Sequence, residues 1–255
     1  DEAGTAISTG DHNVALGYYA LGTEDEHGYN TAIGGRSLFT LNAGAEGYNT
    51  AVGYDSGRLI TTGIKNTLIG SLAGDALTDA DFNVAMGYLA LSVDTLGSGA
   101  TAIGLQALAN QNFTTATTNY NTAVGFQAGL SVSTGIRNTL IGGLAGDALT
   151  TSLDNVAIGA HALSTETTGK YSTAVGQGAL FTQNSGSDAS VHNTAVGYNV
   201  GNAITTATHN TLIGSMAGDA LTTGASNVAV GYGALTTDDV GQHNVAIGRD
   251  ALSAQ

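Results

Sequence analysis

A short pattern of polar and apolar positions recurs along the whole chain. Its core is Asn, then Thr or Val, then Ala or Leu, then an aliphatic residue or Met, then Gly, and it occurs fourteen times. Most copies follow one another at a 17-residue step, and three steps are longer, one of 19 and two of 21. Self-similarity at a fixed period is the signature of a repeat architecture in which each copy builds one coil. The closing glycines are Gly17, Gly34, Gly53, Gly70, Gly87, Gly104, Gly125, Gly142, Gly159, Gly176, Gly197, Gly214, Gly231 and Gly248.

A longer period is superimposed on the short one. The sequence Asn-Thr-Leu-Ile-Gly begins at Asn66, Asn138 and Asn210, which gives a constant 72-residue spacing. Four coils therefore form one super-repeat. Because the register continues to the end of the chain, residues 1–255 are expected to form a single domain. The chain begins at Asp1 and not at Met, so we expect it to be a fragment of a longer fibre protein.

The period and the residue types predict an all-β fold, a parallel β-solenoid of about fourteen 17-residue coils. A 17-residue period has room for two strands of about five residues and two turns. Gly, Thr, Asn and Val are poor helix formers. Glycine also stands three residues before the Asn position in seven coils, where we expect it to supply a positive φ. These glycines are Gly10, Gly63, Gly97, Gly135, Gly169, Gly224 and Gly241.

Two types of coil occur, and they fill the interior differently. In one type the motif glycine is followed by x-x-Ala-Leu, and in the other that Leu is replaced by Gly. The second type carries an apolar residue three places later, which is expected to restore the missing core volume. These residues are Ile60, Leu77, Val132, Leu149, Ile204 and Leu221.

The Asn position predicts a structural ladder. Stacked side-chain amides can hydrogen-bond from coil to coil along a solenoid. Only Ala100 and Ser172 replace Asn at this position. The ladder consists of Asn13, Asn30, Asn49, Asn66, Asn83, Asn121, Asn138, Asn155, Asn193, Asn210, Asn227 and Asn244.

Alternation along the motif predicts that one face of each strand is left for other chains. Successive side chains of a strand point to opposite sides. One side carries Asn, Ala and Gly, which suit a narrow interior. The other side carries bulky residues, which we expect to be buried in a homotrimer. If these residues fill the coil instead, a monomer is the alternative. The expected trimer face consists of Val52, Ile69, Val124, Ile141, Ile158, Val175, Val196 and Ile213.

Composition and charge exclude several classes of function. The formal net charge is −14, and no cluster of Lys or Arg is present to bind phosphates, so nucleic-acid binding is not expected. No apolar run reaches the roughly 18 residues of a membrane helix, so this segment is not expected to insert into a membrane. Without cysteine there is no thiol chemistry and no disulfide framework.

No residue pattern predicts catalysis, a cofactor or a metal site. Four of the six histidines directly precede the Asn position, where other coils carry Tyr or Phe, so we interpret them as members of a structural column. Two sets of acidic residues recur once per super-repeat and are expected to be solvated charges, with calcium shared between chains as the alternative. They are Glu24, Asp94, Glu166 and Asp238 in one set, and Asp75, Asp147 and Asp219 in the other. A column of Thr interrupted by Val leaves ice binding as a minor alternative.

The copies Asn155–Gly159 and Asn244–Gly248, each followed by x-x-Ala-Leu, resemble the head repeats of trimeric autotransporter adhesins of the YadA type. The Asn-Thr-Ala-Val-Gly-Tyr copies at Asn49 and Asn193 are similar to repeats of phage tail fibres and bacterial surface fibres. This resemblance implies a left-handed β-roll, three chains per fibre and an adhesive or receptor-binding role. The coil is longer than in those heads, and residues 1–255 contain no sequence pattern of a heptad stalk, a neck or a membrane-anchor barrel.

The three long coils predict where a receptor binds. Their extra residues lie within 39–48, 109–120 and 181–192 and vary in sequence, and variable loops on a rigid scaffold are common binding positions. We expect an extracellular fibre on a cell surface or virion tail, whose receptor is a host-surface glycan or protein. The alternative is a mechanical filament subunit that stacks end to end without a receptor. The candidate contact residues are Phe39, Asn42, Tyr48, Phe113, Tyr120, Phe181, Asn184 and His192.

Overall fold

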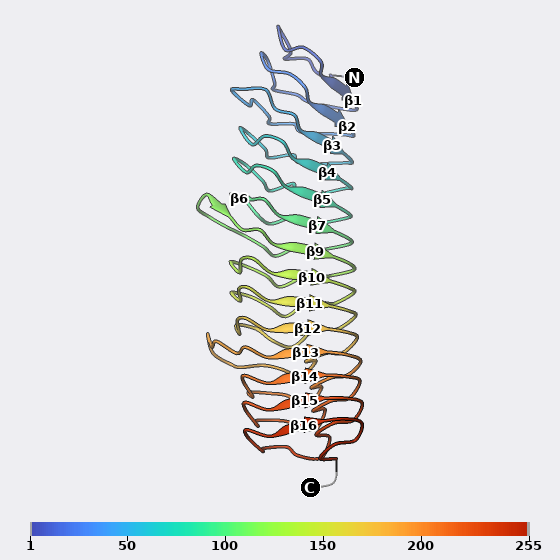
Figure 1. Cartoon of the computed structure of the whole chain (residues 1–255). Coiled ribbons are helices and arrows are strands. Elements are labelled where there is room, and N and C mark those ends of the chain that lie inside the picture. The colour runs from blue at the N-terminus through green and yellow to red at the C-terminus, as the bar shows by residue number, and fades with distance from the viewer. Residues whose placement is uncertain (1, 254–255) are drawn as a thin grey trace. The chain divides into compact units, whose positions relative to one another are not determined.

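The computed structural model describes residues 2–253 and shows an all-β parallel β-solenoid of about fourteen turns, with the 17-residue spacing of the repeat (Figure 1). The fold class predicted from the repeat is thereby confirmed. The chain divides into two compact units, Asp1–Phe126 and Gln127–Gln255. The expectation of a single domain, the left-handed coil and the trimer stay predictions.

Each coil contributes one short strand to the main sheet of its unit. In the first unit these strands are β1 (Val14–Leu16), β2 (Thr31–Ile33), β3 (Thr50–Val52), β4 (Thr67–Ile69), β5 (Val84–Met86), β7 (Thr101–Ile103) and β9 (Thr122–Val124). In the second unit they are β10 (Thr139–Ile141), β11 (Val156–Ile158), β12 (Thr173–Val175), β13 (Thr194–Val196), β14 (Thr211–Ile213), β15 (Val228–Val230) and β16 (Val245–Ile247). Two further strands, β6 (Gly97–Ser98) and β8 (Thr117–Thr118), pair separately.

The strands pair in parallel and in the register of the repeat. Val156 of β11 lies opposite Thr173 of β12, and Ile158 lies opposite Val175. The same alignment of motif positions holds for the other pairs within each unit, so every motif position forms a column. The 19- and 21-residue steps leave this register unchanged, because their extra residues lie outside the strand.

The expectation of two strands per coil is wrong, because each regular coil has one strand of three residues. After the motif glycine every second residue has a positive φ, as at Arg36 (57°) and Leu38 (47°) or Asp55 (56°) and Gly57 (58°). An extended strand cannot accommodate such residues. This segment therefore forms tight turns, which hydrogen-bond to the next coil, as Leu38 N donates to Ser56 O at 3.0 Å.

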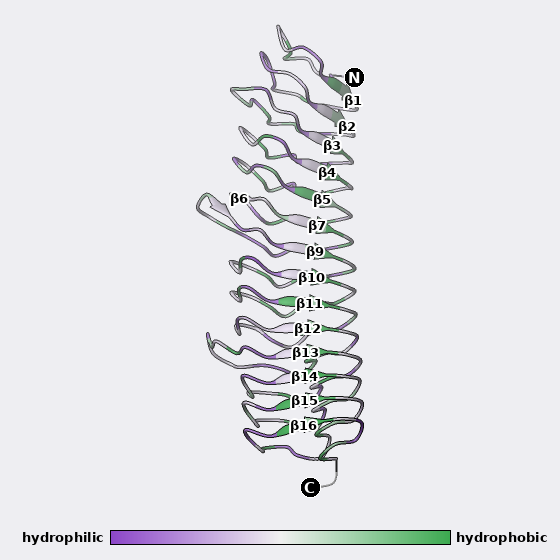
Figure 2. Cartoon of the chain, in the orientation of Figure 1, coloured by the Kyte–Doolittle hydropathy of each residue, from purple (hydrophilic) through white to green (hydrophobic). Residues whose placement is uncertain are grey.

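The core is narrow and is filled from within each coil. The central Ala or Leu of the strand points inward and is fully buried, as in Ala32, Leu68 and Leu140. The predicted compensation between coil types is confirmed, because the six apolar residues that follow Gly-type turns are all fully buried. The first strand residue stays partly accessible, so either Thr or Val occurs there. In Figure 2, β5, β11 and β15 start with Val and are green, whereas the strands that start with Thr are pale.

The Asn ladder is confirmed, but its bonds run mainly from side chain to backbone. In most coils the Asn Oδ1 atom accepts the backbone N–H of the next ladder residue, as between Asn66 and Asn83 at 2.9 Å. The Nδ2 atom usually donates to a carbonyl of the next coil, as from Asn66 to Ala80 at 2.7 Å. Ala100 and Ser172 lack the amide but still donate their N–H groups to Asn83 and Asn155. An amide that makes both bonds, as Asn66 does, therefore fixes the turn of the following coil.

The glycines three residues before the ladder are needed for space and not for a positive φ, contrary to the expectation. None of Gly10, Gly63, Gly97, Gly135, Gly169, Gly224 and Gly241 has φ in the positive region. A Cβ at Gly63 or Gly135 would overlap the carbonyl oxygen of Ala80 or Ser152 in the next coil. Those carbonyls are held there because they accept the Nδ2 bonds of Asn66 and Asn138.

The motif glycine meets two constraints at once. Gly142 has φ of +135°, and a Cβ on it would lie 2.6 Å from the carbonyl carbon and oxygen of Gly159 in the next coil. Backbone atoms cannot move aside as a side chain can. At the neighbouring Gly143 a Cβ would have no atom within 4 Å beyond its chain neighbours, and φ there is not positive.

These two adjacent glycines provide a matched test of coil stacking. We expect Gly142→Ala to destabilise the second unit by about 3 kcal/mol or more, because backbone strain adds to an unrelieved overlap. Gly143→Ala is expected to stay within about 0.5 kcal/mol of the wild type. Urea unfolding followed by circular dichroism measures both. Equal effects of the two substitutions would contradict the stacking constraint.

Candidate functional site

The extra residues of the long coils form loops with exposed tips. In Figure 1 the loop that carries β8 extends well beyond the neighbouring coils, and so does the loop between β12 and β13. Within each unit the rest of the coil keeps its place, so these loops are local additions to a regular scaffold. The exposed tip residues are Asn42, Gly44, Ala45 and Glu46, then Thr114, Thr115 and Ala116, and then Asn184, Gly186, Ser187 and Asp188.

The prediction that Phe113 contacts a receptor is wrong. Phe113 is only 5% exposed, so its ring fills the interior of its coil and cannot contact a receptor. Its N–H donates to Asp94 Oδ1 at 2.9 Å, which holds the residue inside. The other candidates are accessible: Asn42, Tyr48, Tyr120, Asn184 and His192 are exposed, and Phe39 and Phe181 are half-buried.

The interpretation of the first acidic set as solvated charge is wrong. Glu24, Asp94 and Glu166 are fully buried, and each lies in the coil that precedes a long coil. Each carboxylate accepts N–H groups of its own turn and of the following long coil. Glu24, for example, accepts the N–H of His27 at 3.1 Å and that of Ala43 at 3.2 Å. A buried carboxylate is tolerated when hydrogen bonds replace its hydration.

Glu166 makes the largest set of these contacts. Its Oε1 atom accepts the backbone N–H groups of Thr167, Thr168 and Gly169 at 3.0, 3.2 and 2.8 Å. In the long coil, Ser185 donates its N–H to Oε2 at 3.2 Å and its hydroxyl to Oε1 at 3.1 Å. Gln183 Nε2 also donates to Oε2 at 3.1 Å. The carboxylate thus fixes the start of the third loop.

The glutamine partners connect these acids to the Asn ladder. Gln111 donates to Asp94 Oδ2 at 2.6 Å and accepts from Asn121 Nδ2 at 2.8 Å. In the second unit Gln183 accepts from Asn193 Nδ2 at 2.8 Å in the same manner. Ala100 has no side-chain oxygen that could accept the N–H of the next ladder residue, Asn121. Asn119 Oδ1 accepts this N–H instead, at 2.9 Å. A continuous polar network therefore runs from each of these acids through the interior.

The remaining acidic residues of the two sets are half-buried. Asp238 is half-buried and accepts Gly241 N–H at 2.7 Å and Asn244 Nδ2 at 3.0 Å. Asp75, Asp147 and Asp219 are also half-buried, so they are not fully solvated charges either. Burial raises the pKa of Asp75 and Asp219 above the ordinary aspartate value. Burial penalises the charged form of these two carboxyl groups.

Three of the four histidines that precede the ladder, His12, His192 and His209, belong to a column of neighbouring rings, as predicted. His12 stacks on Tyr29 with ring centroids 4.8 Å apart, and Tyr171 stacks on His192 at 5.0 Å. These residues have positive φ, which turns the ring out of the coil and toward the neighbouring ring. Among residues 2–253, no three His, Asp or Glu side chains lie together as a metal site would require.

The strand residues of the expected trimer face point outward, as the alternation predicts. Ile141, Val196 and Ile213 are 37%, 36% and 41% exposed, whereas the central residue of each of these strands is fully buried. The other five residues of that face are half-buried. Aromatic residues lie on both sides of the strand, as Tyr171 before β12 at 41% and Tyr198 after β13 at 48% exposed. Residues 2–253 contain no helix that is long and apolar enough to cross a membrane.

A signal for the buried acids was present in the sequence. Asp94 is followed by Gln111 and Glu166 by Gln183, in each case one regular coil further along the chain. An acid and a glutamine that share one position in consecutive coils are stacked neighbours. The first super-repeat has Leu41 in place of the glutamine, so the signal is present in two of three copies.

We expect Glu166→Gln to loosen the third loop. The new amide nitrogen would face N–H donors, so several hydrogen bonds to a buried group are lost at a cost of about 3 kcal/mol. Amide hydrogen exchange of residues 184–188 should become faster, and the urea midpoint should fall. Glu26→Gln, at an exposed position, is the control and should change neither quantity. Unchanged exchange in the Glu166 variant would show that the loop holds its conformation without the carboxylate.

Comparisons with known proteins do not place the chain in a family. No family model, no curated protein and no solved structure matches it. The structure establishes a parallel β-solenoid repeat protein with an outward apolar face and loops anchored by buried carboxylates.

Proposed function

We propose that this chain is a segment of an extracellular fibre, in which three copies associate side by side and the loops of the long coils bind a receptor. The observation that carries the proposal is the outward strand face, which remains apolar although the core of each coil is already filled. The role is structural and adhesive and needs no catalysis. The bacterial-surface and phage-fibre repeats that the motif resembles favour the same role.

The outward face calls for a partner because it is a continuous column. In the second unit Ile158 lies opposite Val175 and Val196 opposite Ile213, so apolar side chains follow one another from coil to coil. Soluble monomers rarely expose contiguous apolar surface beyond a few hundred Å². Burial of each CH₂ group in an interface contributes roughly 0.8 kcal/mol. Association along the strands would therefore stabilise the fibre.

Side-by-side association favours three chains around one axis. Cyclic symmetry places equivalent coils at the same height, so that each strand face packs on copies of itself and the contact closes. Each coil offers one such face, and a three-chain arrangement is what the resemblance to trimeric adhesin heads implies. The net charge of −14 keeps the outer surface soluble but adds repulsion between chains.

The loops are the surface left for a receptor in such a trimer. They vary between super-repeats while the coils around them do not, and their tips are exposed. Buried carboxylates anchor the base of each loop, so a loop can be held in one conformation without being part of the sheet. Pre-organised loops lose less entropy on binding.

The oligomeric state tests the structural part of this proposal. Multi-angle light scattering is expected to give three times the 25.3 kDa mass of one chain. Ile158→Asp together with Val175→Asp should dissociate the trimer, because two charges per chain would be buried on the axis. The control pair Thr206→Asp and Thr223→Asp puts the same charges on exposed positions of consecutive coils and should leave the trimer intact. A wild-type mass of 25.3 kDa would exclude the trimer.

Shortening the loops tests the adhesive part. Deleting residues 114–117 and 185–188 shortens both 21-residue steps to the 17-residue length of a regular coil. We expect this variant to lose binding to an array of glycans and matrix proteins while its circular dichroism spectrum keeps the wild-type β signal. Binding that survives the deletion would exclude these two loops and leave the loop at residues 42–46, or another surface, as the receptor site.

A further inference from the structure

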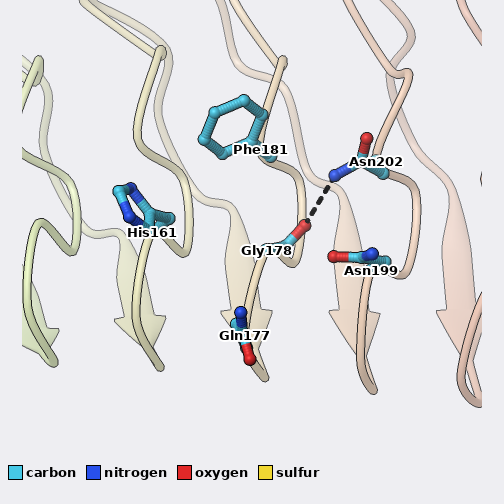
Figure 3. Close-up of a pocket in the computed structure, with 6 residues that line it drawn as sticks. All are labelled: His161, Gln177, Gly178, Phe181, Asn199 and Asn202. Atoms are coloured by element: carbon cyan, nitrogen blue, oxygen red, sulfur yellow. Dashed lines mark hydrogen bonds between the residues drawn. The ribbon is translucent and has the colours of Figure 1, made fainter.

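A surface pocket of about 320 Å³ opens between three consecutive coils of the second unit (Figure 3). Gly178 lies at its centre, with His161 on one side and Asn199 and Asn202 on the other. Phe181 and Gln177 complete the lining. Figure 3 shows these side chains arranged around Gly178.

The pocket exists because glycine interrupts a column of side chains. The second residue after each motif glycine is stacked coil upon coil, and in three successive coils it is His161, Gly178 and Asn199. All three have positive φ, so side chains from the neighbouring coils point along the same surface. A Cβ on Gly178 would overlap Asn199 Oδ1, so the Asn199 amide lies over Gly178 where a side chain would otherwise stand. The pocket opens beside this amide, between His161, Phe181 and Asn202.

The corresponding position in the first long coil is closed. Arg36 stands where Gly178 does, and its guanidinium pairs with Asp55 Oδ2 at 2.6 Å. Arg58 approaches the same carboxylate at 3.6 Å. In the second unit neutral Asn199 and Asn202 replace Asp55 and Arg58 at these repeat positions. The scaffold is thus the same, but an ion-pair network in one coil is replaced by an open, uncharged pocket in the other.

The side chains that line the pocket suit a neutral ligand with several hydroxyl groups. Gln177, Asn199 and Asn202 are planar amides, and each offers both donors and an acceptor. A hydroxyl group also donates and accepts, so amides match pairs of neighbouring hydroxyls. Phe181 is half-buried and packs edge-to-face with His161, with ring centroids 5.9 Å apart, so it provides a fixed apolar wall. Asn202 Nδ2 donates to Gly178 O at 3.4 Å, a long bond that a ligand oxygen can replace.

We infer that this pocket binds a neutral sugar residue, with the C–H face of the ring on Phe181 and the hydroxyls on the amides of Asn199, Asn202 and Gln177. No Lys, Arg, Asp or Glu lines the pocket, so nothing there selects a phosphate, sulfate or carboxylate group. This inference rests on the adhesive part of the proposed function and names its ligand class. The site is distinct from the loop tip at residues 184–188.

NMR titration of the fibre segment with single sugars tests the inference. The probes are the methyl glycosides of glucose, galactose, mannose and N-acetylglucosamine, with sialic acid and glucose 6-sulfate as charged comparisons. An open site with one aromatic wall should bind at least one neutral glycoside with a Kd of about 1–10 mM. The His161 ring and the side-chain amides of Asn199 and Asn202 should then shift together.

Two variants test whether the sugar binds in this pocket. Each introduces a residue that another coil carries at the same repeat position. Gly178→Gln places a side chain in the pocket and displaces the Asn199 amide, and it should abolish the shifts. Gln106 and Gln127 have a similar positive φ at this repeat position, so the backbone accommodates Gln there. Phe181→Ala reproduces Ala109 of the preceding long coil and should weaken binding about tenfold. The control Val240→Ala alters an exposed residue outside the pocket and should bind as the wild type does.

Three outcomes would overturn the inference. The first is the absence of shifts with all four neutral glycosides at about 50 mM, well above the expected Kd. The second is binding that Gly178→Gln leaves unchanged, and the third is stronger binding of the charged sugars than of the neutral ones. Each would leave the trimer mass and the loop-deletion result untouched, so the failure of this site and the failure of the proposed function are separable. A fibre that binds larger glycans but no single glycoside would place recognition at the loops.

Discussion

The contact between the backbones of consecutive coils at the motif glycine is the constraint on which the rest of the structure depends. Gly34 N donates to Leu16 O at 2.7 Å, and the same bond recurs between motif copies throughout each unit. Coils at hydrogen-bonding distance leave no room for a Cβ at this point. The coil can therefore turn here only with glycine, and the strand before it is limited to three residues.

A coil this narrow cannot be stabilised by apolar burial alone. The strand places only one Ala or Leu inside and the turns add a few more apolar residues, so amides and, next to the long coils, carboxylates share the interior. These groups stay buried because each is saturated by hydrogen bonds to the next coil, as Glu166 is by the turn after it and by Ser185. Polar networks of this kind specify register strongly, since a slip of one residue would leave charged and amide groups without partners.

The narrow interior also determines which side chains lie on the surface. Since alternation turns only the central residue of each strand inward, Ile158 and Val175 lie outside, where they form an apolar face with the aromatic columns. Loops and the Gly178 pocket are then the places where one coil differs from its neighbours. In a repeat scaffold, specific recognition can arise from such local exceptions, whereas regular columns serve assembly.

The sequence by itself determined the coil count, the register and the inward side of the strand, because each depends on periodicity and on side-chain size at fixed spacing. It did not determine the conformation of the turns, since a positive φ at Leu38 or Asp55 is contrary to the local preference of these residues and is imposed by bonds to the next coil. Nor did it determine the burial of Phe113, Glu24, Asp94 and Glu166. Their environments are formed by residues of the adjacent coil that only stacking brings together, and a charged residue looks solvated until its partners in the next coil are known. The Gly178 pocket is likewise a property of three stacked coils, because a missing side chain becomes a cavity only when its neighbours on both sides are in place.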